Sequence, residues 1–369
     1  MANKRLLVSA RDPGAAYHIV EIGLYFNNLS NEFDIKFVAS EPAYGIFKRN
    51  NLPVVLVNAL PVSNSYDEGA SQLLDEAKKL INEFSPDAIL VGLSGPDIGI
   101  DEALVACSGD CPTYAMQDFW GDVNHGFKVY PDTYFVLDAK AKEYTEIQVD
   151  SSVIVVGSPR HSKLKGCQEY AEYRLKNRID SSYKILFVGQ PLWELDGYKH
   201  TIKILASELS KCGFNGDVLY RKHPKESISD ANTAIEIFKR KFLRARLDRI
   251  KLLENALCNA DFIVSCYSSC GFDVAQLNQV STKPLAGVLF LLFDEEIFKH
   301  YKQYTMLNDI PLTMLGLSLT VFDRSKLVEC VNLSSSYSWR YAAWKSSKNS
   351  FHDSVGSVQR IHAILRRNI

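Results

Sequence analysis

Short apolar runs alternate with amphipathic stretches from one end of this 369-residue chain to the other, and this alternation limits the fold more than any other feature. Apolar runs of about four to eight residues predict buried strands, whereas apolar residues that recur at helical spacing predict amphipathic helices. A strand can return to a parallel partner only through a crossover, so strands that alternate with helices predict a parallel sheet. The almost wholly apolar run 285–292 predicts a strand buried on both faces.

The alternation forms two successive series. The first predicts strands at 5–9, 35–39, 54–57, 88–91, 113–116, 134–137 and 153–156, and the second at 184–188, 217–220, 261–265 and 285–292. Helices are expected over 16–29 and 70–84, up to residue 178, around 198–211, from residue 271 and over 353–367, with a long basic helix after strand 217–220. We therefore expect an α/β protein of two Rossmann-like domains that face each other across a cleft.

The length of the chain also favours two domains of ordinary size. The strand–helix pattern begins again after Gly157-Ser158-Pro159. We expect domains over 1–157 and 158–340, followed by a helical C-terminal segment over 341–369. Ligands of such domains bind in the loops at the carboxyl ends of the parallel strands, so functional residues are sought there.

The formal net charge of −1 lacks the global positive field expected of a dedicated nucleic-acid-binding protein, so no nucleic-acid partner is expected. One basic stretch, 221–251, carries ten Lys or Arg against four Asp or Glu. It is either a solvated helix face or a rim that attracts phosphate donors or a charged acceptor.

The eight cysteines predict no zinc site. No Cys-x-x-Cys occurs, and the close pairs Cys107/Cys111 and Cys266/Cys270 have no nearby His. We expect reduced, buried thiols, as in a cytosolic protein. No run resembles a signal peptide, and the longest apolar stretch, 284–293, is about half as long as a membrane span. A cytoplasmic protein is therefore expected, and a peripheral membrane association at the inner face stays open.

The loop after the first expected strand is a candidate binding loop. Gly14 lets the backbone approach a ligand, and the N-terminus of the following helix favours an anion. The loop lacks the Gly-x-Gly-x-x-Gly spacing, so it does not indicate a dinucleotide site. Asp12 is either a general base at the strand end or only the cap of the helix. The loop 93–97 after the fourth strand is a further candidate.

The loop after the fifth expected strand combines carboxylates, aromatic rings and an imidazole. Such a set suits a sugar platform with an acid or a base beside it. Asp118 is favoured over Asp122 because it lies closer to the strand end. His125 is the other candidate base, or else an ordinary loop histidine. Phe119 and Trp120 belong to the platform or pack between domains.

In the second half, one strand ends in Arg221-Lys222-His223-Pro224. Arg221 and His223 can donate charge-assisted hydrogen bonds to phosphate oxygens, and Pro224 prevents the strand from continuing. Gln190, in the loop after the first strand of this half, joins them in the expected donor-binding set.

Ser268-Ser269 lies between a predicted strand and a predicted helix. Two hydroxyl groups and the amides of a helix N-terminus can cradle an anion without a glycine-rich loop. The alternative is that the serines only cap the helix. We expect them to bind the same anionic group as His223. Asp273, one turn into the helix, would orient a ribose or support the loop.

Together these motifs resemble a known family. Residues 218–273 resemble the nucleotide-binding half of GT-B-type glycosyltransferases with paired His-Pro and Ser-Ser motifs, which here are His223-Pro224 and Ser268-Ser269. Bacterial sialyl- and Kdo-transferases and the CDP-glycerol glycerophosphotransferases of wall and capsule synthesis are of this kind. The GT-B layout agrees more loosely with the whole chain, including a C-terminal helix that crosses back to the first domain. The loop 118–126 is similar only in position to the Trp-His-Gly loop of the polyol-phosphate transferases.

The resemblance implies an acceptor-side domain over 1–157 and a nucleotide-donor domain over 158–340. It implies that His223 and the serines hold the phosphate of a nucleotide-linked donor, and that a base in the N-terminal half activates the acceptor. The expected activity is inverting transfer of a sugar from a CMP- or CDP/UDP-type donor to a glycan, surface-polysaccharide or lipid-linked acceptor. No Asp-x-Asp occurs, so a metal held by paired carboxylates is not required, and no cofactor is expected.

Three alternatives stay open. A polyol-phosphate transferase would use a CDP-linked donor. A sugar-nucleotide epimerase or hydrolase needs no separate acceptor, and release of nucleotide without acceptor would favour it. A non-catalytic carbohydrate- or partner-binding protein of the same fold would bind no nucleotide saturably.

Overall fold

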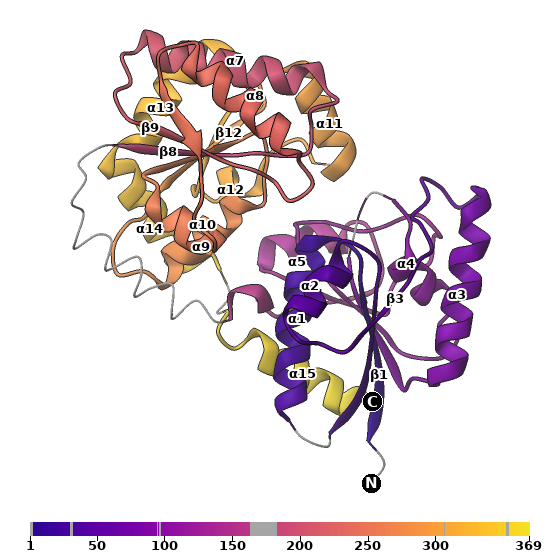
Figure 1. Cartoon of the computed structure of the whole chain (residues 1–369). Coiled ribbons are helices and arrows are strands. Elements are labelled where there is room, and N and C mark those ends of the chain that lie inside the picture. The colour runs from indigo at the N-terminus through magenta and orange to yellow at the C-terminus, as the bar shows by residue number, and fades with distance from the viewer. Residues whose placement is uncertain are drawn as a thin grey trace. The chain divides into compact units, whose positions relative to one another are not determined.

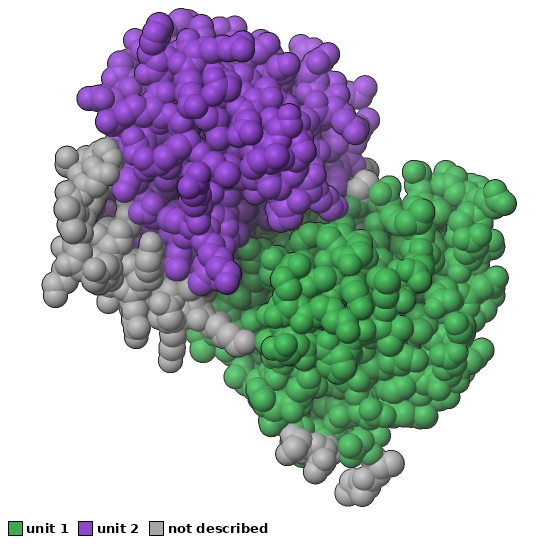
Figure 2. All heavy atoms as spheres, in the orientation of Figure 1, with its two compact units in different colours: residues 1–162, 351–369 green, residues 163–350 purple. Residues whose placement is uncertain are grey.

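A computed structural model describes the protein at residues 3–29, 32–93, 95, 97–162, 183–305, 307–351 and 354–369. Most of the helical stretch expected up to residue 178 lies outside the described residues, as do Cys167 and the first residue of the helix expected over 353–367. The chain divides into two compact units, coloured separately in Figure 2: Met1–Ser162 with Phe351–Ile369 (unit 1), and Lys163–Ser350 (unit 2).

Unit 1 is built on a seven-stranded sheet in the order β3-β2-β1-β4-β5-β6-β7, in which every neighbouring pair is parallel. The strands are β1 (Lys4–Ala10), β2 (Phe33–Ala39), β3 (Val54–Leu56), β4 (Ala88–Gly92), β5 (Thr113–Met116), β6 (Thr133–Val136) and β7 (Ser152–Val155). Each of them overlaps a strand that the sequence predicts, so the parallel sheet of the first half is confirmed.

Helices cover both faces of this sheet (Figure 1). They are α1 (Pro13–Asn28), α2 (Ala43–Arg49), α3 (Glu68–Phe84), α4 (Ile100–Ala106), α5 (Ala139–Glu146), the 3₁₀ turn η1 (Pro159–His161) and α15 (Ser357–Asn368). α1, α2 and α15 lie on one face, and α3 and α4 lie on the other. α3 forms because Ala70, Leu73, Ala77 and Leu80 recur at helical spacing, so that a single face of the helix is buried.

Unit 2 is built on a six-stranded parallel sheet in the order β10-β9-β8-β11-β12-β13. The strands are β8 (Lys184–Val188), β9 (Asp217–Arg221), β10 (Arg244–Leu247), β11 (Phe262–Ser265), β12 (Gly287–Leu291) and β13 (Leu319–Val321). Every residue of β12 is buried, as its apolar sequence predicts.

The helices of unit 2 are α7 (Asp196–Lys211), α8 (Ile228–Lys239), α9 (Leu253–Asn259), α10 (Cys270–Val280), α11 (Glu295–Thr305), α12 (Pro311–Met314), α13 (Leu327–Ser335) and α14 (Tyr337–Ser350), with the 3₁₀ turn η2 (Arg324–Lys326). α7, α8 and α11 lie on one face of the sheet, and α9, α10 and α14 lie on the other (Figure 1). Both units are therefore Rossmann-like, and the predicted fold class is confirmed.

The long basic helix expected after strand 217–220 is wrong in its second half. α8 ends at Lys239, and the chain continues into β10 at the edge of the sheet. The residues of β10 alternate between basic and apolar, which is typical of an edge strand with one face in solvent. Arg244 and Arg246 lie on the same side of the strand, and both pair with Asp217, at 3.3 and 3.1 Å.

Small residues bring the N-terminus of α1 close to the ends of β1 and β4. A Cβ at Gly92 would lie 2.7 Å from the Cβ of Ala15 and 3.3 Å from the Cβ of Ala10, so no larger residue fits at Gly92 without displacement. Ala10 and Ala15 are fully buried. The start of α1 is therefore held against the strand ends by close backbone approach.

The C-terminal helix α15 is part of unit 1. It packs against α1 with Val358, Ile361 and Leu365 buried, and the side chain of Arg360 donates to the carbonyl of Val156 at 2.8 Å. The preceding helix α14 belongs to unit 2 instead.

Among the residues that the structure describes, none of the helices combines the length and the apolar character that a membrane span requires. Seven described cysteines are free thiols. Cys258 and Cys266 are buried, but Cys212 is exposed, which corrects the expectation of buried thiols at that position.

Replacing Gly92 by Ala should destabilise unit 1, because the new methyl group would have to displace Ala15 and with it the start of α1. We expect a loss of about 1–3 kcal/mol in the free energy of unfolding, the usual range for overpacking a core. Urea unfolding measures it. Gln72→Ala on the exposed side of α3 is the control and should change stability by less than about 0.5 kcal/mol. Equal stability of the two variants would contradict the close approach.

Candidate functional site

Each sheet has one place where the strand order reverses. In unit 1 it lies between β1 and β4, and in unit 2 between β8 and β11. The chain leaves neighbouring strands there toward opposite faces of the sheet, which opens a crevice outside their carboxyl ends, and ligands of open α/β sheets bind in it. The predicted site residues Asp12, Gln190 and Ser268 all follow one of these four strands directly or within three residues.

In unit 1 the loops after β1, β4 and β5 converge at this point. A Cβ at Gly14 would overlap the carboxylate of Asp118, and a Cβ at Gly95 would lie 3.3 Å from Asp122 Oδ1. The carbonyl of Asp97 accepts hydrogen bonds from Arg11 Nη2 at 2.8 Å and from Asn124 Nδ2 at 2.9 Å. The two glycines therefore leave room for both carboxyl groups beside the N-terminus of α1.

Asp118 and Asp122 form a hydrogen-bonded carboxyl pair. Burial, together with the charges of Asp122 and Asp12, raises the pKa of Asp118 well above its usual range. Burial and the charge of Asp12 raise the pKa of Asp122 to about 6, although its hydrogen bond with Asp118 opposes the shift. Two neighbouring carboxyl groups do not both ionise easily, because each negative charge disfavours the other. Such a pair can both accept and donate a proton near neutral pH.

A second group of charged residues lies beneath these loops. Arg11 is 5% exposed, and a Cβ at Gly99 would lie 2.6 Å from its Nε. Glu102 caps α4 by accepting from the N–H of Gly99 at 2.7 Å, and Asp101 accepts from the hydroxyl of Ser9 at 2.5 Å. Burial and the charge of Asp101 raise the pKa of Glu102 to about 8, against the opposing charge of Arg11. The layer under the site therefore holds a further proton at neutral pH.

The other candidate residues of unit 1 differ in their position and contacts. Asp12 occupies the N-cap position of α1 but makes no capping hydrogen bond with its side chain. Its charge acts on both members of the carboxyl pair. His125 is exposed and directs its ring nitrogens to Tyr130 at 2.9 Å and Gln148 at 3.3 Å. Trp120 is 2% exposed and donates to Asp138, so it belongs to the core of unit 1 and not to a sugar platform.

In unit 2 the loops after β8 and β11 are joined by Gln190. Its Oε1 accepts from the backbone N–H of Tyr267 at 3.0 Å, and its backbone N–H donates to the hydroxyl of Tyr198 at 2.9 Å. Ser268 Oγ accepts from the N–H of Cys270 at 3.2 Å, whereas Ser269 is the N-cap residue of α10 but makes no capping hydrogen bond with its side chain. Ser268 thus performs part of the capping role that was the alternative to phosphate binding.

The His223 loop follows β9, and its imidazole has a defined tautomer. The backbone N–H of Lys225 donates to His223 Nδ1 at 3.1 Å, so in the neutral ring the proton is on Nε2. β9 and β11 both pair with β8, which places them about 10 Å apart, or two strand spacings. The His223 and Ser268 loops consequently open at the same edge of the sheet, on either side of Gln190.

Two predicted donor-binding residues point into the protein. The guanidinium of Arg221 pairs with Asp248 at 2.5 Å and donates to the carbonyl of Ile250 at 2.9 Å, so it holds the loop after β10. Asp273 is 1% exposed and lies in the buried part of α10.

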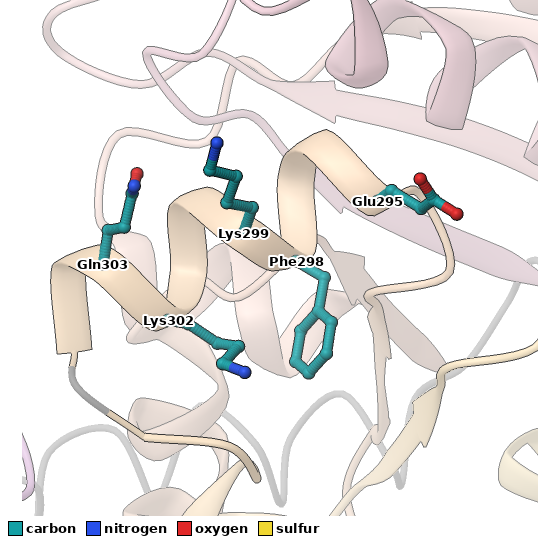
Figure 3. A pocket seen from close by; sticks show the side chains of 5 residues that line it. All are labelled: Glu295, Phe298, Lys299, Lys302 and Gln303. Atoms are coloured by element: carbon teal, nitrogen blue, oxygen red, sulfur yellow. The ribbon is translucent and has the colours of Figure 1, made fainter.

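A shallow hollow lies elsewhere on unit 2. Figure 3 shows that its lining side chains come from the single helix α11: Glu295, Phe298, Lys299, Lys302 and Gln303. None of the sequence-predicted site residues lines it. In the described part of the chain, no three His, Cys, Asp or Glu side chains are grouped so that they could hold a metal ion.

Sequence reasoning gave too little weight to Asp122 and overlooked Glu226. Distance from the strand end favoured Asp118 over Asp122, yet the loop turns at Gly121, which has a φ of 67°, and so brings both carboxyl groups to the same place. Glu226 is buried three residues after His223. The signal for it was present, because a carboxylate three residues after His223 can accept from its backbone N–H around the turn.

No family model matches the sequence, and no curated protein matches it. Solved structures do match over nearly the whole chain. A UDP-GlcNAc 2-epimerase from Neisseria meningitidis bound to UDP-GlcNAc has a TM-score of 0.66 at 13% identity, with 98% of this chain and 100% of that chain covered. The UDP-GlcNAc 2-epimerase from Methanocaldococcus jannaschii in complex with UDP-GlcNAc and UDP has a TM-score of 0.67 at 15% identity, with 98% and 99% covered. MurG from Acinetobacter baumannii has a TM-score of 0.62 at 12% identity, with 99% of each chain covered.

At these identities the likeness concerns the fold. The chain has the GT-B fold of two Rossmann-like units, and the expectation of that fold is confirmed.

Replacing Asp122 by Asn should stabilise the protein at pH 7.5. The pKa of Asp122 in the folded state, about 6, lies above its unfolded value, so wild-type stability falls as the pH rises from about 4 to about 6. An uncharged amide removes this loss. We expect the melting temperature to rise by a few degrees at pH 7.5, where about 1 kcal/mol corresponds to ~2–4 °C. The gain should shrink at pH 4.5.

Thermal melts at both pH values measure the effect. Asp75→Asn, at an exposed position of α3, is the matched control and should show no such pH dependence. A lower melting temperature for the Asp122 variant at pH 7.5 would show that the pair is not under electrostatic strain.

Proposed function

We propose that this chain is an enzyme that acts on a nucleotide-linked sugar, as an inverting glycosyltransferase with a glycan or surface-polysaccharide acceptor. The Asp118–Asp122 carboxyl pair carries the proposal, because it provides an acid/base group near neutral pH at the point of unit 1 where ligands are expected. The fold supports it, since two of the similar structures contain UDP-GlcNAc.

In the proposed reaction, unit 2 binds the phosphates of the donor. The Nε2–H of His223 and the hydroxyl of Ser269 are the donors for phosphate oxygens, and the N-terminus of α10 adds its dipole. Gln190 holds the backbone of Tyr267 and so fixes the start of the serine loop. These groups stabilise the negative charge that develops on the leaving nucleotide.

Unit 1 supplies the base. The ionised carboxyl group of the Asp118–Asp122 pair removes the proton of the acceptor hydroxyl, and the oxygen attacks the anomeric carbon of the sugar. The bond between that carbon and the phosphate oxygen breaks, and the nucleotide leaves with the electron pair. Attack from the side opposite the leaving group inverts the anomeric configuration. No step requires a metal or a redox cofactor.

A sugar-nucleotide 2-epimerase is the second candidate, and one observation favours it. Several of the similar structures are UDP-GlcNAc 2-epimerases, and a carboxyl pair with raised pKa values can both remove and return a proton. Incubation with UDP-GlcNAc in D₂O without acceptor separates the candidates. Epimerisation incorporates deuterium at C2 of the sugar, whereas a glycosyltransferase leaves C2 protonated.

A polyol-phosphate transferase is distinguished by the bond that breaks. Transfer from a CDP-linked donor would cleave the phosphoanhydride and release CMP, whereas sugar transfer from a nucleoside diphosphate donor releases the diphosphate. For a nucleoside diphosphate donor, product analysis by anion-exchange chromatography therefore assigns the transferred group.

Nucleotide binding tests the role assigned to unit 2. We expect at least one of CMP, CDP, UDP, GDP and dTDP to raise the melting temperature saturably, because a ligand that binds only the native state stabilises it. His223→Ala should weaken that shift and reduce turnover about 10²–10³-fold, the scale of removing one donor to the developing charge. His200→Ala, an exposed imidazole of the same unit bonded to Asp294, is the matched control. A change below about threefold in the His223 variant would remove His223 from the mechanism.

Replacing Asp118 by Asn tests the role of unit 1. Transfer should be abolished, because the pair loses the carboxyl group that lies beside the N-terminus of α1, while nucleotide affinity should stay within about twofold, because the donors to the phosphates lie in unit 2. Asp110→Asn, an exposed carboxylate before β5, should keep full activity. If Asp118→Asn and Asp12→Asn both remain active, the base is a different residue.

A further inference from the structure

Glu226 is a buried acidic residue that the proposed reaction does not use directly. Glu226 is 6% exposed, and its carboxylate accepts three hydrogen bonds. Oε1 accepts from the hydroxyl of Tyr220 at 2.7 Å and from the indole N–H of Trp193 at 2.5 Å, and Oε2 accepts from the backbone N–H of His223 at 2.6 Å. Burying a carboxylate is unfavourable unless donors surround it, so this set of donors is what stabilises Glu226 inside unit 2.

The three donors come from different parts of the binding edge. Trp193 lies in the loop after β8, Tyr220 lies in β9, and His223 lies in the loop after β9. Gly189 makes room for the carboxylate, because a Cβ there would overlap Glu226 Oε2 and lie 2.6 Å from the hydroxyl of Tyr220. Glu226 thus joins the loop that carries the imidazole to β9 and to the loop after β8.

Other hydrogen bonds of the loop join residues within the loop. Lys222 Nζ donates to the carbonyls of His223 at 2.8 Å and of Glu226 at 2.6 Å, and the N–H of Glu226 donates to the carbonyl of His223 at 3.0 Å. The N–H of Lys225 fixes the imidazole through Nδ1. Glu226 is therefore the anchor through which this self-bonded loop is joined to the buried core, by its hydrogen bonds with Tyr220 and Trp193.

We propose that Glu226 is the positioning residue of the donor-phosphate site: its carboxylate holds the backbone of His223 so that the Nε2–H of the imidazole is presented to a phosphate group of the nucleotide. This inference rests on the proposed function of His223. Glu226 acts through His223 and does not touch the substrate, since its oxygens are occupied by protein donors. Preorganisation of this kind improves binding by removing the entropic loss of ordering the loop.

The test is a double-mutant cycle of Glu226→Gln and His223→Ala. The isosteric amide has one acceptor oxygen and one donor nitrogen, so it cannot accept from all three donors. We expect Glu226→Gln to weaken binding of the nucleotide selected from CMP, CDP, UDP, GDP and dTDP about 10-fold or more in the wild-type background. In the His223→Ala background the same change should cost less than about twofold, because residues that act as a unit are not additive.

A role limited to stability predicts a different result. Glu226→Gln would then lower the melting temperature but weaken nucleotide binding by the same factor in both backgrounds, and that outcome overturns the proposal. Glu236→Gln, an exposed carboxylate of α8 paired with Lys239, is the matched control and should change neither quantity. Should Glu226→Gln fail to fold, Trp193→Phe removes one donor and enters the same cycle, with an expected loss of about threefold.

Hydrogen exchange separates the failure of this inference from the failure of the proposed function. In wild type the amide of His223 is bonded to Glu226, so exchange of the segment 221–227 should accelerate at least 10-fold in Glu226→Gln without any ligand. Unchanged exchange means that Glu226 does not hold the loop. If exchange accelerates but the protein binds none of the five nucleotides, Glu226 positions the loop for something other than a donor phosphate. That result refutes both the proposed function and the proposed ligand of the loop.

Discussion

Parallel pairing of the strands is the constraint on which the rest of this structure depends. A parallel strand can be reached only through a crossover, so the strands of each sheet end at one edge, and helices begin there. The strand order reverses once in each sheet. The acidic pair of unit 1 lies in the loop after β5, which meets the loops after β1 and β4, and the imidazole and serine loops of unit 2 follow β9 and β11, the two neighbours of β8. The chemistry of both sites is thus placed by the connectivity of the chain before any side chain is considered.

Close packing then determines how near the functional groups come to one another. Gly92, Ala10 and Ala15 let α1 begin directly against the strand ends, and Gly14 leaves the space that the carboxylate of Asp118 occupies. A single added methyl group at Gly92 would displace the helix, and one at Gly14 would displace the carboxylate. Small residues at the carboxyl end of the sheet are consequently part of the site, although none of them has a reactive group.

The carboxylates of the two units illustrate how surroundings decide the role of one chemical group. Glu226 accepts hydrogen bonds from Tyr220, Trp193 and His223, which makes it a structural anchor of the loop. Asp118 and Asp122 lie next to each other, with Asp12 nearby. Burial and the neighbouring negative charges raise the pKa values of both carboxyl groups, so the pair can bind and release a proton near neutral pH. The first arrangement suits positioning, and the second suits acid–base chemistry.

Local patterns of the sequence were sufficient for most strands and insufficient for several side-chain roles. The eleven predicted strands were found because buried parallel strands are apolar along their length, whereas β10 and β13 were missed because they are short strands at the sheet edges. Arg221 shows the limit for side chains. Its position after β9 suggested a phosphate contact, but the carboxylate that binds it, Asp248, is 27 residues away along the chain.

The sequence by itself determined the fold class and indicated the candidate loops, because the order of apolar residues and turns sets burial and chain connectivity. Only the tertiary structure decided which side chains in those loops meet. The joining of Gln190 to Tyr267 and of Glu226 to His223, and the pairing of Asp118 with Asp122, depend on close approach between segments or around a turn. Such contacts are set by packing in three dimensions, and no periodicity along the chain reports them.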